Sequence, residues 1–491
     1  MRRLIPRIVV TAVILLTGWV ALGAAIFWTL KPQTGSARAA GAKAAKPPPP
    51  LPLFEGWPKP EAVVVISGQQ LGFMEPCGCA PGQMGGLTRR HTFLHELQQR
   101  GWPIALVDLG SLVKDKTRQD EIKFDRSLKI MQDNFGYAAV GVGPEDLALG
   151  SLRLLEWLIN DPKLPLVTAN VVFSEDEADV LKRYVVAPVS GLRLGMTSVV
   201  AGEYVEKVKE EGTIVKPPEE VLPEVLKQLA AESDVQILLA QAPPEESKKL
   251  AEQFPEFDVV VTAGGYEDPD NRPVWVGDTL IVSPGKKGKH VVVVGLFPEA
   301  QGKDRLRLQL VPLNPNFAAS KDIQDAMDKY QDILKEEGLV EELPRVPTPE
   351  GATYVGAREC GRCHTQAYKK WMTTPHAKAW KTIEEHHRQY DPQCVFCHTT
   401  GNNPETGVTY ETGFFNAQQT PLLANNGCEN CHGPGSKHAA DEHNPDYLAM
   451  VRRSAKAAKE QHLCQKCHDQ DNSPEFDFDK YWPDIVHPGR D

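Results

Sequence analysis

The sequence predicts two folded domains, an α/β layered sandwich followed by a mostly helical, loop-rich domain, after a single N-terminal apolar segment. Residues 61–315 alternate apolar runs with amphipathic stretches, the pattern of strands and helices packed in layers. Residues 351–491 contain only 11 Val, Ile and Leu residues among 141, too few for an ordinary aliphatic core. One apolar run long enough to span a membrane lies at residues 8–30.

Residues 1–30 are predicted to be a membrane anchor or a signal peptide. Residues 8–30 carry no charge, and a spanning helix needs about 20 apolar residues, so an uncleaved anchor is favoured. The sequence Ala37-Arg38-Ala39 leaves a cleaved signal as the alternative. Three arginines precede the run and place the N-terminus in the cytoplasm, so the rest of the chain is exported under either interpretation.

An Ala- and Pro-rich linker at residues 31–60 follows the apolar segment. It contains four consecutive prolines at 47–50 and is expected to form a semi-extended tether. The net charge of −11 argues against nucleic-acid binding, because such binding depends on neutralising phosphates. The chain is therefore expected to contact a membrane through its anchor and to have no nucleic-acid partner.

Strands and helices alternate through the first predicted domain, residues 61–315. Seven apolar runs are predicted strands: residues 62–67, 104–109, 137–142, 166–172, 235–240, 258–262 and 290–296. Three amphipathic stretches are predicted helices: residues 119–135, 221–232 and 245–253. A helical connector is predicted at residues 316–350, where an amphipathic helix at 320–337 is followed by the Pro-containing segment 346–350.

Four copies of the motif CxxCH lie in the last 132 residues and contain eight of the ten cysteines. They are Cys360-Gly-Arg-Cys363-His364, Cys394-Val-Phe-Cys397-His398, Cys428-Glu-Asn-Cys431-His432 and Cys464-Gln-Lys-Cys467-His468. Cysteines three apart on a helical turn share a face, so both sulfurs can reach one porphyrin. The motif is typical of c-type haem attachment, whereas zinc ribbons and disulfide frameworks need no histidine after each cysteine pair. Residues 351–491 are therefore predicted to carry four covalently bound haem c groups.

The motif residues have distinct predicted roles. The eight cysteines are thioether anchors, and the proximal iron ligands are His364, His398, His432 and His468. The domain contains seven further histidines, which is enough to give each of the four irons a second histidine ligand. They are His376, His386, His387, His438, His443, His462 and His487. Since aliphatic residues are scarce, the macrocycles would serve as the core, and the domain is expected not to fold without haem.

The order of these motifs over about residues 353–491 resembles the cytochrome c-554 family of tetrahaem proteins. The most specific part is the string Cys428-Glu-Asn-Cys-His-Gly-Pro-Gly. The resemblance implies that the distal ligands are His376, His438 and His487. It also implies one five-coordinate haem, which by motif order is the haem on Cys394 and Cys397. His386 or His387 could close that position, and the sequence leaves this open.

The first domain resembles the calcineurin-like metallophosphoesterases of the 5′-nucleotidase branch. Matching segments lie at residues 85–90, 106–110, 136–141 and 166–171. The family's metal ligands are missing from the corresponding positions: residues 68–72 lack Asp-x-His, 141–145 lack Asn-His, Gln241 replaces a histidine and 264–267 lack Gly-His-x-His. Only Asp108 remains, so the resemblance implies the fold without a two-metal site, and phosphoesterase activity is not expected.

The segment Glu75-Pro-Cys77-Gly-Cys79-Ala-Pro81 carries the only two cysteines outside the haem motifs. Three interpretations remain open: a structural disulfide, a labile redox disulfide, or a pair of thiolates for a soft metal such as copper. His91 and His95, one helical turn apart, could join a metal site.

Two functions are considered on this basis. The first is an exported tetrahaem cytochrome that transfers electrons to redox proteins of the same compartment, with the α/β domain as a docking or redox module. The second is a multihaem oxidoreductase that acts on a small nitrogen or sulfur compound at an open haem or at Cys77 and Cys79. The predicted location is the periplasmic or extracytoplasmic side of the membrane, anchored or, after cleavage, soluble. No catalytic residue is identified.

Overall fold

The computed structural model describes residues 52–489 except residues 79, 174–179 and 209–211. The predicted anchor at residues 1–30, most of the predicted linker and Cys79 lie outside the described residues. Within the part of the chain that is described, no helix combines the length and the apolar character needed to cross a membrane.

The first sheet of the α/β domain has six strands in the order β14-β13-β1-β2-β3-β4. Their bounds are β1 Ala62–Ser67, β2 Ile104–Asp108, β3 Ala139–Gly141, β4 Leu166–Val167, β13 His290–Leu296 and β14 Leu306–Pro312. β1 to β4 are parallel neighbours, whereas β13 pairs antiparallel with β1 and β14. Every residue of β1 is buried, as its continuous apolar run predicts for a strand covered on both faces.

The second sheet also has six strands, in the order β11-β12-β10-β9-β7-β6. Their bounds are β6 Val185–Val189, β7 Leu192–Val200, β9 Val235–Gln241, β10 Val259–Thr262, β11 Val274–Val276 and β12 Thr279–Val282. Side chains of both sheets, such as Val64 and Ile237, belong to one buried apolar cluster. The two sheets therefore pack face to face as a sandwich. A separate two-stranded sheet joins β5 (Val171–Val172) to β8 (Ile214–Val215).

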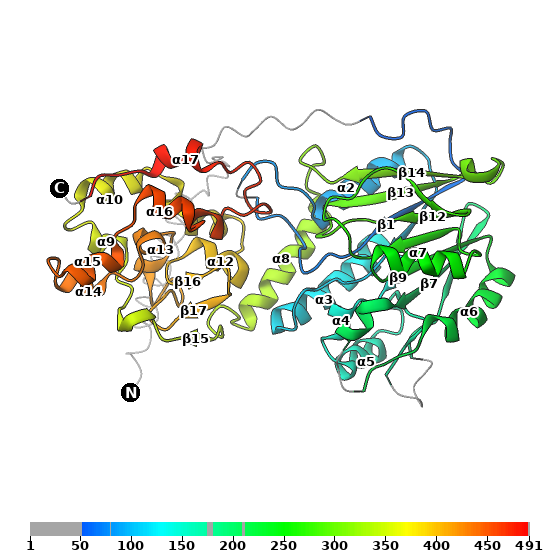
Figure 1. The fold of residues 1–491 in the computed structure, drawn as a ribbon, viewed down its shortest axis with the longest axis horizontal. Helices are drawn as coiled ribbons and strands as arrows, with labels where there is room; N and C mark the ends of the chain where they lie inside the picture. Colours follow the sequence, from blue (N-terminus) through cyan, green and yellow to red (C-terminus); the bar gives the residue numbers. More distant parts are fainter. Residues whose placement is uncertain (1–51, 79, 174–179, 209–211, 490–491) are drawn as a thin grey trace, which may run out of the picture. The chain divides into compact units, whose positions relative to one another are not determined.

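Helices cover the outer sides of this sandwich (Figure 1). The helices of the domain are α2 Leu87–Gln99, α3 Arg118–Ile130, α4 Pro144–Leu147, α5 Ser151–Asn160, α6 Pro218–Glu232 and α7 Pro244–Gln253. α2 and α3 contribute Phe93 and Phe124 to the shared core. α6 and α7 pack on the second sheet in a second cluster that includes Leu222, Leu250 and Val260. The predicted α/β layered sandwich is confirmed.

All seven predicted strands are present, but the run 166–172 forms two short strands, β4 and β5. The three predicted helices are present too, and the last turn of the stretch 119–135 is a π-helical turn at Met131–Phe135. The structure adds β6, β7, β8, β11, β12 and β14, which were not predicted. β14, for example, alternates apolar and polar residues at a sheet edge, so it does not stand out as an apolar run.

The C-terminal region consists of short helices, as predicted. They are α9 Ala357–Cys360, α10 Thr365–Met372, α11 Ala379–Glu385, α12 Pro392–His398, α13 Cys428–His432, α14 Ser436–Ala440, α15 Pro445–Val451, α16 Ala455–Glu460 and α17 Phe478–Ile485. A small sheet adds β15 (Arg345–Val346), β17 (Val408–Tyr410) and β16 (Asn402–Asn403), in that order. The longer helix α8 (Lys321–Glu336) precedes the region, where the connector helix was predicted.

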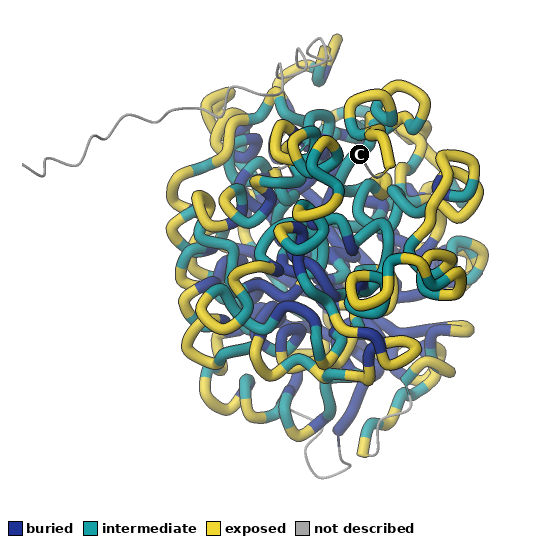
Figure 2. Tube along the Cα trace, turned by 90° about the vertical axis from the view of Figure 1, so that its left-hand side faces the viewer, coloured by how far each residue is buried: buried dark blue, intermediate teal, exposed yellow. Residues whose placement is uncertain are grey.

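The aliphatic core of the C-terminal region is small. Its buried apolar cluster, among the residues described, is Val340, Ile383, Val395, Phe414 and Leu423. Most of the remaining residues from 351 to 489 are half-buried or exposed, which Figure 2 shows as teal and yellow along the trace nearest the viewer. Packing by side chains alone therefore leaves this region without an ordinary core, as its composition predicts.

Candidate functional site

The four CxxCH motifs form short helical turns. The second and third motifs lie in α12 and α13. In the first, the amide of His364 donates to the carbonyl of Cys360 at 3.0 Å, and in the fourth the amide of His468 donates to that of Cys464 at 2.9 Å. Such turns place both cysteines of a motif on one face, within reach of one porphyrin. All eight motif cysteines are free thiols and so available for thioether bonds.

Three motif histidines lie against a second histidine. The ring centroids are 6.1 Å apart for His364 and His438, 6.0 Å for His468 and His376, and 5.9 Å for His432 and His487. Two metal–nitrogen bonds of about 2 Å each, plus the distance from each nitrogen to its ring centre, give a centroid separation of roughly 6 Å. Each pair therefore fits one iron ion between its rings, and the three partners are the residues predicted as distal ligands.

The histidine of the second motif, His398, has no second histidine ring against it among the described residues. Its Nδ1 donates to the carbonyl of Ala379 at 2.6 Å. His386 is exposed, and His387 bonds the carboxylate of Asp332 through Nε2 at 3.0 Å. Neither of these histidines is seen against the ring of His398 among the described residues.

Hydrogen bonds at Nδ1 also orient two other motif histidines. His432 Nδ1 donates to the carbonyl of Val451 at 2.7 Å, and His468 Nδ1 shares a hydrogen bond of 2.9 Å with the Ser473 hydroxyl. A ring held through Nδ1 presents Nε2 to a metal ion. The positions of both rings are therefore set by the protein before any metal is considered.

Burial keeps these rings in the neutral form that binds metal ions. Desolvation lowers the pKa of His398, His432 and His468 below its usual value. It lowers the pKa of His376 to about 4, with a further contribution from His468 and His398 nearby. These imidazoles are therefore uncharged at neutral pH, so their nitrogen lone pairs are available.

The motifs contact one another in a definite order. A hydrogen bond joins Cys360 of the first motif to Cys428 of the third and raises the pKa of Cys360. Another joins Cys397 of the second to Cys467 of the fourth and raises the pKa of Cys467. The third and fourth motifs approach through Cys431 and Cys464: burial raises the pKa of the Cys431 thiol, and the neighbouring Cys464 raises it further. The succession is therefore first, third, fourth and second motif, with His398 at one end.

Glu429, the first variable residue of the third motif, is a buried carboxylate that the sequence analysis did not single out. Its side chain accepts hydrogen bonds from the amides of Val355 at 2.9 Å, Gly356 at 2.7 Å and Gly435 at 2.8 Å. Burial raises the pKa of Glu429, while the three amides act against this shift. The carboxylate thereby joins the third motif to the segment that leads into the first.

Asn430, the second variable residue of this motif, makes the equivalent link to the second motif. Its amide group donates to the carbonyl of Thr399 at 2.8 Å, and its side-chain oxygen accepts from the Thr400 hydroxyl at 2.7 Å. Thr399 directly follows His398. The only sequence signal for both residues was their place in the string Cys428-Glu-Asn-Cys-His-Gly-Pro-Gly, the most specific part of the family resemblance.

Glutamine side chains lie at two positions where the family resemblance would place metal ligands in the α/β domain. Gln69 donates to the carbonyl of Gly285 at 2.9 Å and accepts from the amide of Gly264 at 2.8 Å. Gln241 donates to the carbonyl of Leu109 at 2.6 Å. Neutral amides bonded to the backbone thus fill these positions, and no group of three or more potential metal ligands occurs among the described residues.

Asp108, the one ligand retained, is fully buried beside a cation of the protein itself. It accepts hydrogen bonds from the Ser67 hydroxyl at 2.5 Å and the Gly110 amide at 2.8 Å. Arg90, 1% exposed, lies 3.8 Å from it and also donates to the Tyr137 hydroxyl at 3.1 Å. Burial raises the pKa of Asp108. A guanidinium therefore balances this carboxylate, a role sequence reasoning did not assign to Arg90.

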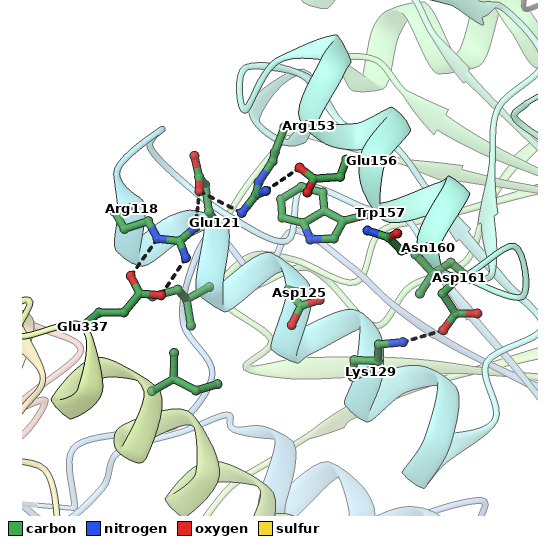
Figure 3. Close-up of a pocket in the computed structure, with 13 residues that line it drawn as sticks. Arg118, Glu121, Asp125, Lys129, Arg153, Glu156, Trp157, Asn160, Asp161 and Glu337 are labelled. Atoms are coloured by element: carbon green, nitrogen blue, oxygen red, sulfur yellow. Dashed lines mark hydrogen bonds and ion pairs between the residues drawn. The ribbon is translucent and has the colours of Figure 1, made fainter.

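A cavity of about 350 Å³ lies between α3, α5 and α8 (Figure 3). Its charged groups are engaged with one another: Arg118 with Glu121 at 2.5 Å and Glu337 at 2.6 Å, Arg153 with Glu156 at 2.5 Å, and Lys129 with Asp161 at 2.5 Å. The Arg118–Glu337 pair ties the connector helix to the α/β domain. These side chains are therefore paired with one another across and along the cavity wall.

Cys77 is disulfide-bonded, whereas Cys79 lies outside the described residues. This state supports the two disulfide interpretations over a thiolate pair for a soft metal. His91 shares a hydrogen bond of 2.8 Å with the Ser320 hydroxyl, and His95 shares one of 3.2 Å with Gln99. The described residues therefore do not gather these histidines into a metal site.

Comparison with known proteins agrees with the motif order. Residues 359–433, which contain three of the four CxxCH motifs, match the family model described as cytochrome c554 and c-prime. Cytochrome c-554 of Nitrosomonas europaea is 30% identical over 105 residues, 18% of this chain and 42% of that protein. The chain thus spans less than half of this relative's length. The match implies covalently bound c-type haem in the C-terminal region.

Solved structures similar to the chain include several phosphoesterases. The sulfate thiohydrolase SoxB of Thermus thermophilus has 18% identity and a TM-score of 0.48, covering 58% of this chain and 62% of that one. A 5′-nucleotidase precursor of the same organism has 18% identity and a TM-score of 0.49, covering 66% and 67%. Both scores are below 0.5.

Proposed function

We propose that the protein is an exported cytochrome that carries four covalently bound haem c groups and transfers electrons between redox proteins. The observation that carries the proposal is the set of three histidine pairs at 5.9–6.1 Å, each containing one CxxCH histidine. Haem iron supplies reversible one-electron chemistry. A histidine on each side of the iron leaves no position for substrate, so such a site conducts electrons.

The chain's own residues prepare these sites. The motif cysteines anchor the macrocycles, the Nδ1 hydrogen bonds of His432 and His468 orient the rings, and burial keeps them neutral. The contacts between neighbouring motifs bring the four sites into one succession that is suited to electron transfer. We assign His398 to the end of that succession.

Spectroscopy of the haem-loaded protein tests the proposal. We expect four haems per chain, three low-spin with two histidine ligands and one high-spin. Replacing His376, His438 or His487 by alanine should convert one low-spin signal to high-spin each time. His443→Ala is the matched control, because its side chain is 85% exposed. If none of the three substitutions changes the low-spin signal of the wild type, the assignment of these histidines as distal ligands is contradicted.

The unpaired second site supports an alternative function as an oxidoreductase for a small nitrogen or sulfur compound. No histidine ring of the described residues is seen against His398. Carbon monoxide or nitric oxide should then bind the reduced protein at one haem per chain. A fully low-spin protein that takes up neither gas would remove this alternative.

We further propose that the α/β domain is a catalytically inactive docking or redox module, since glutamine amides stand at two expected ligand positions and Arg90 lies beside Asp108. The N-terminal apolar segment at residues 8–30 would tether the protein to the membrane, or be cleaved to release it into the periplasm. Cell fractionation and N-terminal sequencing of the mature protein distinguish these two cases. Hydrolysis of nucleotides or phosphate esters with added Mn²⁺ or Zn²⁺ would contradict an inactive domain.

A further inference from the structure

The loop that contains Cys77 lies against the segment of the fourth haem motif. Gln83 is 2% exposed, and its amide group donates both to the sulfur of Cys77 at 2.8 Å and to the carbonyl of Asn472 at 2.8 Å. The next residue, Ser473, shares a hydrogen bond of 2.9 Å with Nδ1 of His468. One buried side chain therefore links the sulfur to the backbone that orients the fourth motif's histidine.

Ion pairs hold both sides of this contact together. The ammonium groups of Lys287 and Lys289 form ion pairs with the carboxylate of Asp471, at 2.5 and 2.7 Å. These pairs bind the α/β domain to the loop that follows His468. On the other side of the cysteine loop, Glu75 pairs with Arg388 and both side chains are largely buried. The carbonyl of Arg388 accepts the amide of Asp391 at 3.2 Å, and Asp391 caps the helix that contains the second motif.

The cysteine loop also has an open side. Cys77 is only partly buried, the adjacent Gly78 is exposed, and a Cβ placed on Gly78 would meet no atom within 4 Å. The amide of Gly78 is held by the side-chain oxygen of Gln83 at 2.8 Å, so the same residue fixes both sides of the loop's first turn. A thiol compound can therefore approach from solvent while the sulfur stays bonded to Gln83.

We propose that the disulfide formed by Cys77 is a redox site that takes electrons from dithiol compounds and passes them to the haems bound at His468 and His398. This step rests on the proposed haem function. A dithiol substrate would break the protein disulfide by exchange and leave as its own disulfide, giving two thiols on the protein. These thiols would then lose two protons to water and one electron to each of two ferric haems, and the S–S bond would form again.

Alkylation of the haem-loaded protein gives the first readout. The eight motif cysteines are thioethers in that protein and cannot react, so intact mass counts the remaining thiols. We expect no alkylation in the oxidised protein and two alkylated cysteines after treatment with dithiothreitol. The reductant is then removed and ferricyanide is added to oxidise the haems. We expect the number of cysteines that can be alkylated to return to zero as the haem spectrum returns to its oxidised form.

Stopped-flow reduction of the haems by dithiothreitol gives the second readout. Cys77→Ser, and separately the wild type with its two thiols alkylated, should be reduced about tenfold more slowly than the untreated wild type. Reduction by dithionite should be unchanged in all three. Gln83→Leu should keep the alkylation count but slow haem reduction by dithiothreitol, whereas the exposed Gln98→Leu on α2 should not.

Equal rates for wild type, Cys77→Ser and the alkylated protein would overturn the proposal, as would thiols that stay unreactive in dithiothreitol. In either case the haem spectra of the protein would be unchanged. The proposed haem function would therefore still stand, although the disulfide proposal had failed. A failure of the proposed haem function would appear as missing haem or as haem that dithionite does not reduce.

Discussion

Glu429 shows at the scale of one residue how a position between two haem-binding cysteines links separate segments of the chain. Its carboxylate accepts three backbone amides from two segments, one of which leads into the first motif. Buried amide donors that lose their acceptor cost about 1–3 kcal/mol. A residue between two haem-binding cysteines thus acts on the neighbouring site.

Replacing Glu429 by Gln should destabilise the haem-loaded protein by about 1–3 kcal/mol, because a side-chain NH₂ would face the amides of Val355 or Gly435. Denaturant unfolding followed by the haem absorption measures the effect. Glu384→Gln, at an exposed position of α11, is the control and should change little. Equal stability of the two variants would show that the three hydrogen bonds contribute nothing net.

Asp146 gives a pH-dependent prediction at the same scale. It accepts hydrogen bonds from the amides of Ser111, Leu112 and Gly143, and burial raises its pKa from 3.8 to about 7. A carboxyl whose pKa is raised in the folded state favours folding below its unfolded pKa. That contribution is lost as the pH rises from about 4 to about 7.

The difference in unfolding free energy between wild type and Asp146→Asn should therefore fall as pH rises through this range. The slope is at most about 1.4 kcal/mol per pH unit. Calorimetry of both proteins at several values between pH 4 and 8 measures it. A pH-independent difference would mean that Asp146 has the same pKa in both states.

At the scale of elements, helix α12 is held by the α/β domain and its connector. Asp391 caps α12 by accepting the amide of Gln393 at 2.9 Å. The same carboxylate accepts from Gln119 of α3 at 2.8 Å and lies 3.4 Å from the Tyr330 hydroxyl of α8. One side chain thus begins the helix of the second haem motif and docks it on two other helices.

Asp391→Ala should cost more than the loss of a helix cap, which is typically about 1 kcal/mol, because Gln119 would lose a buried acceptor. The matched control is Asp477→Ala, which removes the exposed cap of α17 alone. Thermal unfolding and the spectrum of the second haem are the measurements. If the two variants are destabilised equally and the spectrum of the second haem is unchanged, the contact of Asp391 with α3 and α8 does not position α12.

At the scale of the whole molecule, the two domains have cores of different kinds. The α/β sandwich buries aliphatic side chains between its sheets, whereas the C-terminal cluster contains only five buried apolar residues in the part described. A region so poor in buried apolar surface cannot offset the conformational entropy of folding by itself. We therefore expect its stability to depend on bound haem.

Protein produced without haem attachment, with the eight motif cysteines changed to alanine, should therefore keep a folded α/β domain and lose the C-terminal one. Limited proteolysis followed by mass spectrometry should give cleavage throughout residues 351–491 and protection of 61–315. The haem-loaded wild type should resist cleavage in both regions. Equal protection of the two proteins would show that side chains alone fold the C-terminal region.

Local patterns were sufficient to predict the sandwich, the short helices and the haem attachment motifs. Apolar runs identify central strands such as β1, since both faces are covered. They do not identify β14, whose alternation is that of an edge strand. Glu429 and Asp391 also escaped prediction, because an acidic residue in a sequence is typical of a solvated surface, and only their partners from distant segments show that they are buried.

The sequence by itself determined which residues can bind haem, because attachment depends on a spacing of three residues within one helical turn. It also determined that the metal ligands of the phosphoesterase-like domain are missing. Only the tertiary structure decided that His376 faces His468, that His487 faces His432, and that Cys77 lies one side chain away from the fourth motif. These are contacts between segments far apart in the chain, and no local pattern encodes which of them meet.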